Sequence, residues 1–185
     1  MNIKSGMIGF SNNKVGLLPK LIRFFTKSTI SHTFILTQFI ENEPTVQEAS
    51  LLVQIVPFNK YYIEDNTQSY WIYEIKQELV SKEQIDQSLT YCFKEFAGVK
   101  YGKLQLLWFP YRSLMEFFRK DVRKQKNWLS DGVICSELVF YYLYNLGELF
   151  QNLLKDFNPD TIQAEDIRQI VINNPDIFTL KECKI

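Results

Sequence analysis

The chain contains one histidine, His32, and three cysteines, Cys92, Cys135 and Cys183. Cys135 lies in the segment Val-Ile-Cys-Ser-Glu-Leu-Val, where an apolar run with helical spacing begins. A cysteine nucleophile has to be ionised, and both a neighbouring imidazole and a helix N-terminus favour its thiolate. Because His32 is the one imidazole in the sequence, a cysteine enzyme built from this chain would use the pair Cys135 and His32.

A third residue of such a site orients the imidazole by accepting its second N–H. His32 opens a strand-like run, and a turn separates this run from a second one that contains Glu48. A hairpin would place the two runs side by side, so Glu48 is the candidate for this role, with Gln47 and Gln38 as alternatives. The backbone N–H of Cys135, at the predicted helix start, is a candidate oxyanion donor.

Each of these residues also has a purely structural interpretation. A cysteine on an apolar helix is more often a small buried hydrophobe than a nucleophile, and a lone histidine near a strand is more often structural. We expect Glu137, in the first turn of the same helix, to be a solvated or capping residue. The residues alone therefore indicate a candidate pair, Cys135 with His32, and leave its activity open.

The composition restricts the class of protein. With 185 residues and 46% hydrophobic content, the chain can bury the core of one domain. The 21 basic and 21 acidic residues cancel, so no global charge points to nucleic acid. The widely spaced cysteines indicate neither a disulfide framework nor a zinc site, and we expect no metal and no cofactor. No leader or membrane-spanning run is visible, so a cytoplasmic protein is expected.

Strand-like segments dominate the first part of the chain and helical segments the second, which favours an α+β domain. We expect an antiparallel sheet of hairpins, or a small barrel, packed against helices. The predicted strands are residues 6–10, 33–40, 45–49, 51–56, 71–75 and 177–180. The predicted helices are residues 17–25, 81–96 with a capping box at Ser81, 104–123 with an interruption near Pro110, 134–146 with a C-cap at Gly147, and a short one after Pro159.

Four segments form one pattern along the chain: a glycine-bearing first strand at 6–10, a Ser-His strand at 30–35, the strand 46–49, and the Cys-Ser-Glu helix at 133–139. This pattern resembles the circularly permuted NlpC-type papain-like superfamily, in its YiiX-like branch, which is related to lecithin-retinol acyltransferase. In that branch the histidine precedes the cysteine, as it does here. The resemblance implies a papain-like fold over residues 1–185.

The resemblance also implies roles for individual residues. Cys135 would be the nucleophile, His32 the base and Glu48 the orienting residue. Tyr101 and Ser136 would contact the oxyanion or the substrate. Residues 104–128 look like a basic helical insertion, which is either a solvated helix face or, at 111–128, a lid or a peripheral contact with a membrane surface.

The function expected from this resemblance is that of a thiol hydrolase. The bond cleaved would be an amide, as in a peptide or N-acyl linkage of a cell-wall fragment. One alternative is a lipid acyltransferase or esterase that uses the same pair, and another is a catalytically silent binding or structural module. The partner would be a small peptide, N-acyl or lipid substrate, and the texture of the sequence fits a bacterium or phage. The oligomeric state stays open.

Overall fold

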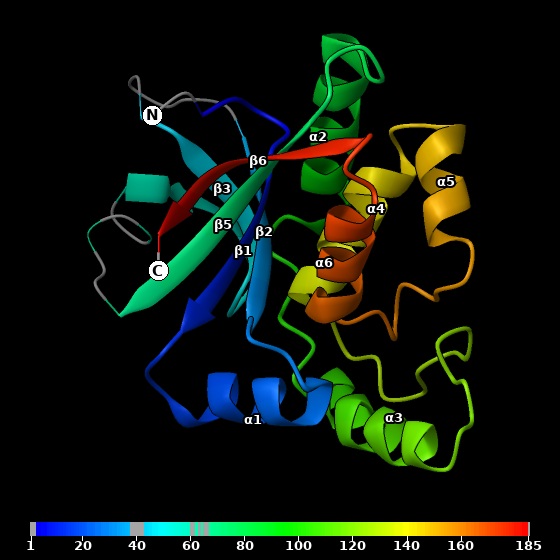
Figure 1. Ribbon diagram of the computed structural model, residues 1–185. Coiled ribbons are helices and arrows are strands. Elements are labelled where there is room, and N and C mark those ends of the chain that lie inside the picture. Colours follow the sequence, from blue (N-terminus) through cyan, green and yellow to red (C-terminus); the bar gives the residue numbers. More distant parts are fainter. Residues whose placement is uncertain (1–2, 38–42, 60–61, 63, 65–66, 185) are drawn as a thin grey trace.

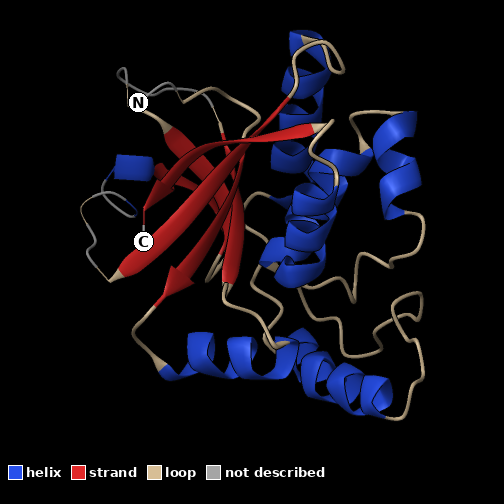
Figure 2. Cartoon of the chain, in the orientation of Figure 1, coloured by secondary structure: helices blue, strands red, loops and turns tan. Residues whose placement is uncertain are grey.

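The computed structural model describes residues 3–37, 43–59, 62, 64 and 67–184. A twisted antiparallel sheet occupies one side of the molecule, with helices α2, α4 and α6 beside it and α5 on the far side of α4, while α1 and α3 lie across one end (Figures 1 and 2). These helices are α1 (Leu17–Thr26), α2 (Lys82–Phe96), α3 (Trp108–Phe117), α4 (Cys135–Tyr144), α5 (Glu148–Leu154) and α6 (Ala164–Asn173). The α+β class expected from the sequence is confirmed.

The sheet has six strands in the order β4-β3-β2-β1-β5-β6, and all neighbouring pairs are antiparallel. The strands are β1 (Ile8–Asn13), β2 (His32–Leu36), β3 (Thr45–Ala49), β4 (Val53–Pro57), β5 (Gln68–Ile75) and β6 (Phe178–Lys184). Strands β1 to β4 form the expected hairpin series. The expectation that the fifth strand continues this series was wrong, because after β4 the chain returns to the other edge of β1.

The sheet buries both of its faces. Along β2 the side chains alternate, because successive residues of a strand point to opposite faces. Ile35 belongs to the core between the sheet and the helices, and Phe34 and Leu36 belong to a second cluster on the opposite face. Phe58 and Tyr62, from the segment after β4, complete this second cluster.

Helix α4 lies at the centre of the fold. It contacts β2, β3, α2, α5 and α6, and eight of its ten residues are buried. A helix that is apolar nearly all round can be stable only in such a position. Since α4 begins at Cys135, its central position also fixes the place of that cysteine.

Several boundaries differ from those expected. The capping box at Ser81 is confirmed, because its hydroxyl accepts from Gln84 N–H and the Gln84 side chain accepts from Ser81 N–H. The expected interruption near Pro110 is a change from a 3₁₀ helix at Leu104–Leu107 to α3, and Pro110 lies in the first turn of α3, where its missing N–H is tolerated. The helical part of residues 104–128 ends at Phe117, so the expectation of a helix through this segment was wrong for its basic second half.

Two other expectations on helices need correction. Gly147 directly precedes α5 and is its N-cap rather than a C-cap of α4, and α5 itself was missed. The predicted strand 33–40 is observed as far as Leu36, and its last three residues lie outside the described part of the chain. Within the described residues, none of the helices has the length and apolar character needed to cross a bilayer.

Candidate active site

Cys135 and His32 come from two elements that pack against each other. His32 is the first residue of β2, and Cys135 is the first residue of α4, which lies across β2 and β3. Both are largely buried, with 5% of Cys135 and 19% of the His32 side chain exposed. The His32 side chain is hydrogen-bonded to the sulfur of Cys135. The fold thus brings together the two residues that the sequence pairs.

Glu48 lies on the adjacent strand, β3, and its carboxylate holds the imidazole from the other side. The His32 Nε2 atom is 3.1 Å from Glu48 Oε2. Because Nε2 is bound to Glu48, Nδ1 is the ring nitrogen left for the Cys135 sulfur. The hairpin expected from the sequence therefore places Glu48 where an orienting residue would stand, while Gln47 points to the opposite face of the same strand.

Glu48 has two further partners. The Tyr62 hydroxyl donates to Glu48 Oε2 at 2.6 Å, and Gln54 Nε2 donates to Oε1 at 3.3 Å. Burial opposes the charge on Glu48, but the hydrogen bonds from His32, Tyr62 and Gln54 outweigh it and lower the pKa from 4.5 to about 2. Tyr62 was not anticipated, since it lies outside any periodic segment and no motif marks it.

The electrostatics of the group favour an ion pair. Burial opposes the charge on His32, yet the negative sulfur of Cys135 and the carboxylate of Glu48 raise the pKa of the imidazole from 6.5 to about 10. Burial likewise opposes the thiolate, and the His32 imidazolium lowers the pKa of Cys135 below 9.0. Both shifts favour the thiolate and the imidazolium over the neutral pair.

Backbone groups also stabilise a negative sulfur. The N–H groups of Thr33 and Ser136 hydrogen-bond to Cys135 and lower its pKa. Ser136 is the second residue of α4, so its N–H is one of the first-turn donors that have no partner within the helix. The position of Cys135 at a helix start, inferred from the sequence, supplies this contact.

Tyr101 lies beside the sulfur as well. It is buried, and its hydroxyl is hydrogen-bonded to Cys135, while burial and the negative sulfur raise its pKa well above 10.0. A parallel bridge joins Tyr101 to Val133, two residues before the cysteine. The two segments meet closely at Gly132, where an added Cβ would lie 2.2 Å from the carbonyl oxygen of Lys100. Glycine at this position thus allows Tyr101 to reach the site.

Ser136 and Glu137 serve the surroundings of the site through their side chains. The Ser136 hydroxyl donates to the carbonyl oxygen of Ile162 at 2.6 Å, so its side chain anchors α4 to the segment before α6 and is not directed at the sulfur. Glu137 is buried and accepts from Gln105 Nε2 at 3.2 Å. Burial raises its pKa to about 7. Of the two roles expected for Glu137, the solvated one was wrong, while the capping one agrees with the effect of the Ile134 backbone, at the N-cap of α4, on the pKa of Glu137.

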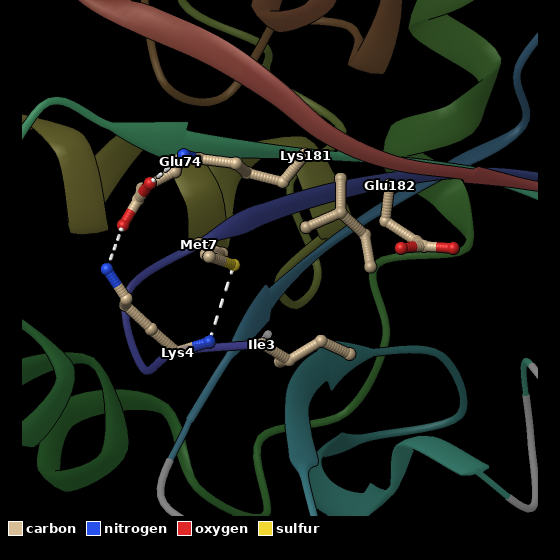
Figure 3. A pocket seen from close by; sticks show the side chains of 7 residues that line it. Ile3, Lys4, Met7, Glu74, Lys181 and Glu182 are labelled. Atoms are coloured by element: carbon tan, nitrogen blue, oxygen red, sulfur yellow. Dashed lines mark hydrogen bonds and ion pairs between the residues drawn. The ribbon is translucent and has the colours of Figure 1, made fainter. Parts of the chain in front are cut away.

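A small hollow lies on the sheet face that is turned away from the helices, and apolar and charged side chains line it (Figure 3). Its apolar wall contains Ile3, Met7 and Ile72, and Glu74 accepts from Lys4 and Lys181 at 2.8 Å and 2.7 Å. Its volume is about 80 Å³, which is room for only a few water molecules. The residues that line it include neither a cysteine nor a histidine, so the group around Cys135 remains the candidate site.

Metal ligation was tested on the same side chains. Among residues 3–37, 43–59, 62, 64 and 67–184, no group of three or more His, Cys, Asp or Glu side chains is arranged to hold a metal ion. His32 interacts instead with Glu48 on one side and with Cys135 on the other.

Comparison with known proteins identifies a similar fold. No protein-family model matches the chain, and no curated protein matches it. The crystal structure of the metalloprotein YiiX from Escherichia coli O157:H7 is similar, with a TM-score of 0.62 and 19% sequence identity. The match covers 98% of this chain and 97% of that one. The chain therefore has a YiiX-like fold along nearly its whole length.

Proposed function

We propose that the chain is a thiol hydrolase of the permuted papain-like type, which cleaves an amide bond with Cys135 as nucleophile and His32 as proton carrier. One observation carries the proposal: the hydrogen-bonded series Tyr62–Glu48–His32–Cys135, buried between β2, β3 and the start of α4. A structural cysteine needs no imidazole beside it, and a structural imidazole needs no buried carboxylate on its other nitrogen.

The first half of the reaction forms an acyl-enzyme. The Cys135 thiolate attacks the carbonyl carbon of the amide, and the electron pair of the C=O bond moves to the oxygen. The N–H of Cys135, at the start of α4, and the Tyr101 hydroxyl, beside the sulfur, are the candidate donors to this developing charge. Collapse of the intermediate breaks the C–N bond, and the His32 imidazolium gives its proton to the departing amine.

The second half restores the enzyme. Neutral His32 takes a proton from water, and the resulting hydroxide attacks the thioester carbon. The C–S bond breaks, the acid is released, and the thiolate is left again beside an imidazolium. The Nε2–H group of His32 donates a hydrogen bond to Glu48 throughout, which keeps Nδ1 directed at the sulfur and stabilises the charged ring.

The substrate class that suits this chemistry is a peptide or N-acyl amide, such as a cell-wall fragment. The YiiX structure is described as that of a metalloprotein. The described side chains of this protein do not fit a site with three His, Cys, Asp or Glu ligands, and the proposed steps use protein groups alone. An alcohol in place of water would attack the same thioester, so acyl transfer is the second candidate. The exposed apolar side chains of α1, the helix that precedes β2, favour this candidate.

The test is to trap the acyl-enzyme. We expect mass spectrometry to find an acyl adduct on Cys135 after incubation with N-acyl peptides or with phospholipids, and to find none in Cys135→Ala. His32→Ala should slow acylation by about 10²- to 10⁴-fold, the usual contribution of a general acid or base. An adduct from the peptides supports the amidase and one from the phospholipids the acyltransferase. Full activity in Cys135→Ala would contradict the proposal, and no adduct from either class would contradict it and favour a silent module.

A further inference from the structure

Helix α1 has an apolar face that no other part of the described structure covers. None of its ten residues is buried. Leu17, Leu21 and Phe24, which follow at intervals of four and three, form one stripe along the helix and are 73%, 42% and 75% exposed. An amphipathic helix normally turns its apolar stripe to the core, so this stripe needs another explanation.

The neighbouring helix extends this apolar surface. Helix α1 contacts α3, and the two lie together across one end of the molecule (Figure 1). Leu114 and Phe117 of α3 are 51% and 76% exposed. Further along the chain, Phe118 and Trp128 are 59% and 67% exposed. We call the surface of residues 14–27 and 103–128 the α1–α3 end.

The charge of the α1–α3 end is positive. No acidic residue precedes Glu41 in the sequence. The acidic residues between 97 and 130 are Glu116 and Asp121, and each forms an ion pair with an arginine, Arg112 and Arg123 respectively. The exposed basic residues of this end are Lys14, Lys20, Lys27, Lys103, Arg119, Lys120, Lys124 and Lys126, and of these Lys124 forms an ion pair with Asp156. An occupant of this surface must therefore offer both apolar material and negative charge.

We propose that the α1–α3 end docks on the surface of a bilayer that contains anionic lipids, with α1 lying in the plane of the interface. A helix with leucine and phenylalanine on one side and lysines beside them suits the boundary between acyl chains and anionic headgroups. A second copy of the chain suits it less, because a symmetric contact through this face would bring like charges together. Nucleic acid offers no apolar surface of this extent.

The sequence suggested a membrane contact at residues 111–128. The structure changes the set of residues that would make this contact. Arg112 and Asn127 of that segment are buried, and Arg112 pairs with Asp166. Helix α1 supplies the continuous stripe instead. Because the chain passes from α1 into β2, which begins at His32, docking by α1 would bring the His32 end of the sheet close to the bilayer. The proposal itself does not depend on catalysis.

Vesicle co-sedimentation of the full chain tests the proposal. We expect binding to vesicles of phosphatidylcholine with phosphatidylglycerol, and binding about tenfold weaker or more to phosphatidylcholine alone. The double variant Leu21→Ser/Phe24→Ser should weaken binding by about tenfold or more. Its matched control, Phe93→Ser/Leu149→Ser, changes helical residues that are 48% and 42% exposed on α2 and α5, and it should bind as the wild type does.

A second experiment on vesicle binding removes positive charge from the α1–α3 end. Lys20→Gln/Lys27→Gln should weaken binding to the anionic vesicles and reduce its dependence on salt, whereas Lys82→Gln/Lys155→Gln should not. All these side chains are exposed, so circular dichroism should show each variant folded. No binding to anionic vesicles, equal binding by the α1 variants and their controls, or a dimer of wild type that the α1 variant abolishes without vesicles would each overturn the proposal. Loss of acylation by Cys135→Ala would leave vesicle binding unchanged.

Discussion

At the scale of single residues, Glu48 is the point on which the charges of the site depend. Its carboxylate binds His32, Tyr62 and Gln54, and the charge of His32 depends in turn on Glu48 and Cys135. Removing one member should therefore change the protonation of the others, because the titration of neighbouring buried groups is shared.

The pH dependence of stability follows from the same shifts. Folding lowers the pKa of Glu48 from 4.5 to about 2, so its carboxylate stabilises the fold above pH 4.5, and this contribution is lost as the pH falls through 2. Folding raises the pKa of His32 from 6.5 to about 10, so its contribution is present below pH 6.5 and lost as the pH rises through 10.

We predict that urea unfolding of the wild type shows both losses, and that Glu48→Gln flattens the acid side of the curve while His32→Gln flattens the alkaline side. The unfolding free energy, measured across the pH range, gives the comparison. Acid and alkaline sides that keep the wild-type slopes in these variants would mean that Glu48 and His32 are not held in the charged forms described above.

Tyr62 gives a sharper test of the hydrogen bonds around Glu48. Tyr62→Phe keeps the ring, which lies 4.4 Å from the Phe34 ring, and removes only the hydroxyl that binds Glu48. We predict a loss of about 1.5–3 kcal/mol in unfolding free energy, as for a hydrogen bond to a charged group. Tyr144→Phe, at a 43% exposed tyrosine, is the matched control and should change it little. Equal losses of unfolding free energy in the two variants would contradict a role of the Tyr62 hydroxyl in stabilising Glu48.

At the scale of elements, the segment before α4 is held against Tyr101 at Gly132. An added Cβ would lie 2.2 Å from the Lys100 carbonyl oxygen, and backbone cannot yield as a flexible side chain does. We predict that Gly132→Ala destabilises the fold by about 1–3 kcal/mol and slows acylation of Cys135, because the two segments must separate. Ser130→Ala, at an exposed neighbour, is the control. Wild-type stability and acylation in Gly132→Ala would contradict this role.

Helices α3 and α6 are joined by a buried ion pair. Arg112 donates to both carboxylate oxygens of Asp166, at 2.5 Å and 2.8 Å, and only 5% of its side chain is exposed. We predict that Arg112→Leu costs about 3–5 kcal/mol, because it leaves the Asp166 carboxylate without its partner. Arg123→Leu, which breaks the exposed pair with Asp121, should cost about 1 kcal/mol or less. Thermal denaturation of the two variants makes the comparison, and similar losses would contradict it.

The elements that could be predicted are those with a local signal. The turn residues 41–44 before β3, the capping box of α2 and the apolar run of α4 are each signals carried by neighbouring residues. The pairing of β5 with β1 and the extent of β6 depend on contacts between distant segments, which the sequence does not display. Helix α5 could not be predicted, because its N-cap, Gly147, also fits the end of the helical pattern before it.

The candidate site shows the same division. His32, Cys135 and Glu48 could be found because the chain offers one imidazole, one cysteine at a helix start and one acidic residue on the neighbouring strand. Tyr62 and Gln54 could not be found, since their contacts with Glu48 arise from the path of the chain after β4. The burial of Glu137 could not be found either, because it depends on Gln105, which reaches it from another segment.

At the scale of the whole molecule, the fold gathers the N-terminus of its central helix, one end of its sheet and an exposed basic-apolar surface in neighbouring parts of the structure. Helix α1 leads into β2 at His32, and the segment after α3 leads into α4 at Cys135. A YiiX-like fold therefore carries the candidate pair on two rigid elements that continue from the helices of the α1–α3 end.

The most direct test of the pair is the rate of iodoacetamide labelling of Cys135 as a function of pH, in a Cys92→Ser/Cys183→Ser background. The account predicts fast labelling well below about pH 8.5, where a free thiol is mostly protonated. In His32→Gln the rate should fall at neutral pH and recover only toward alkaline pH. Labelling that is slow at neutral pH in the wild type, with a pH profile that His32→Gln leaves unchanged, would contradict the central claim that His32 keeps Cys135 as a thiolate.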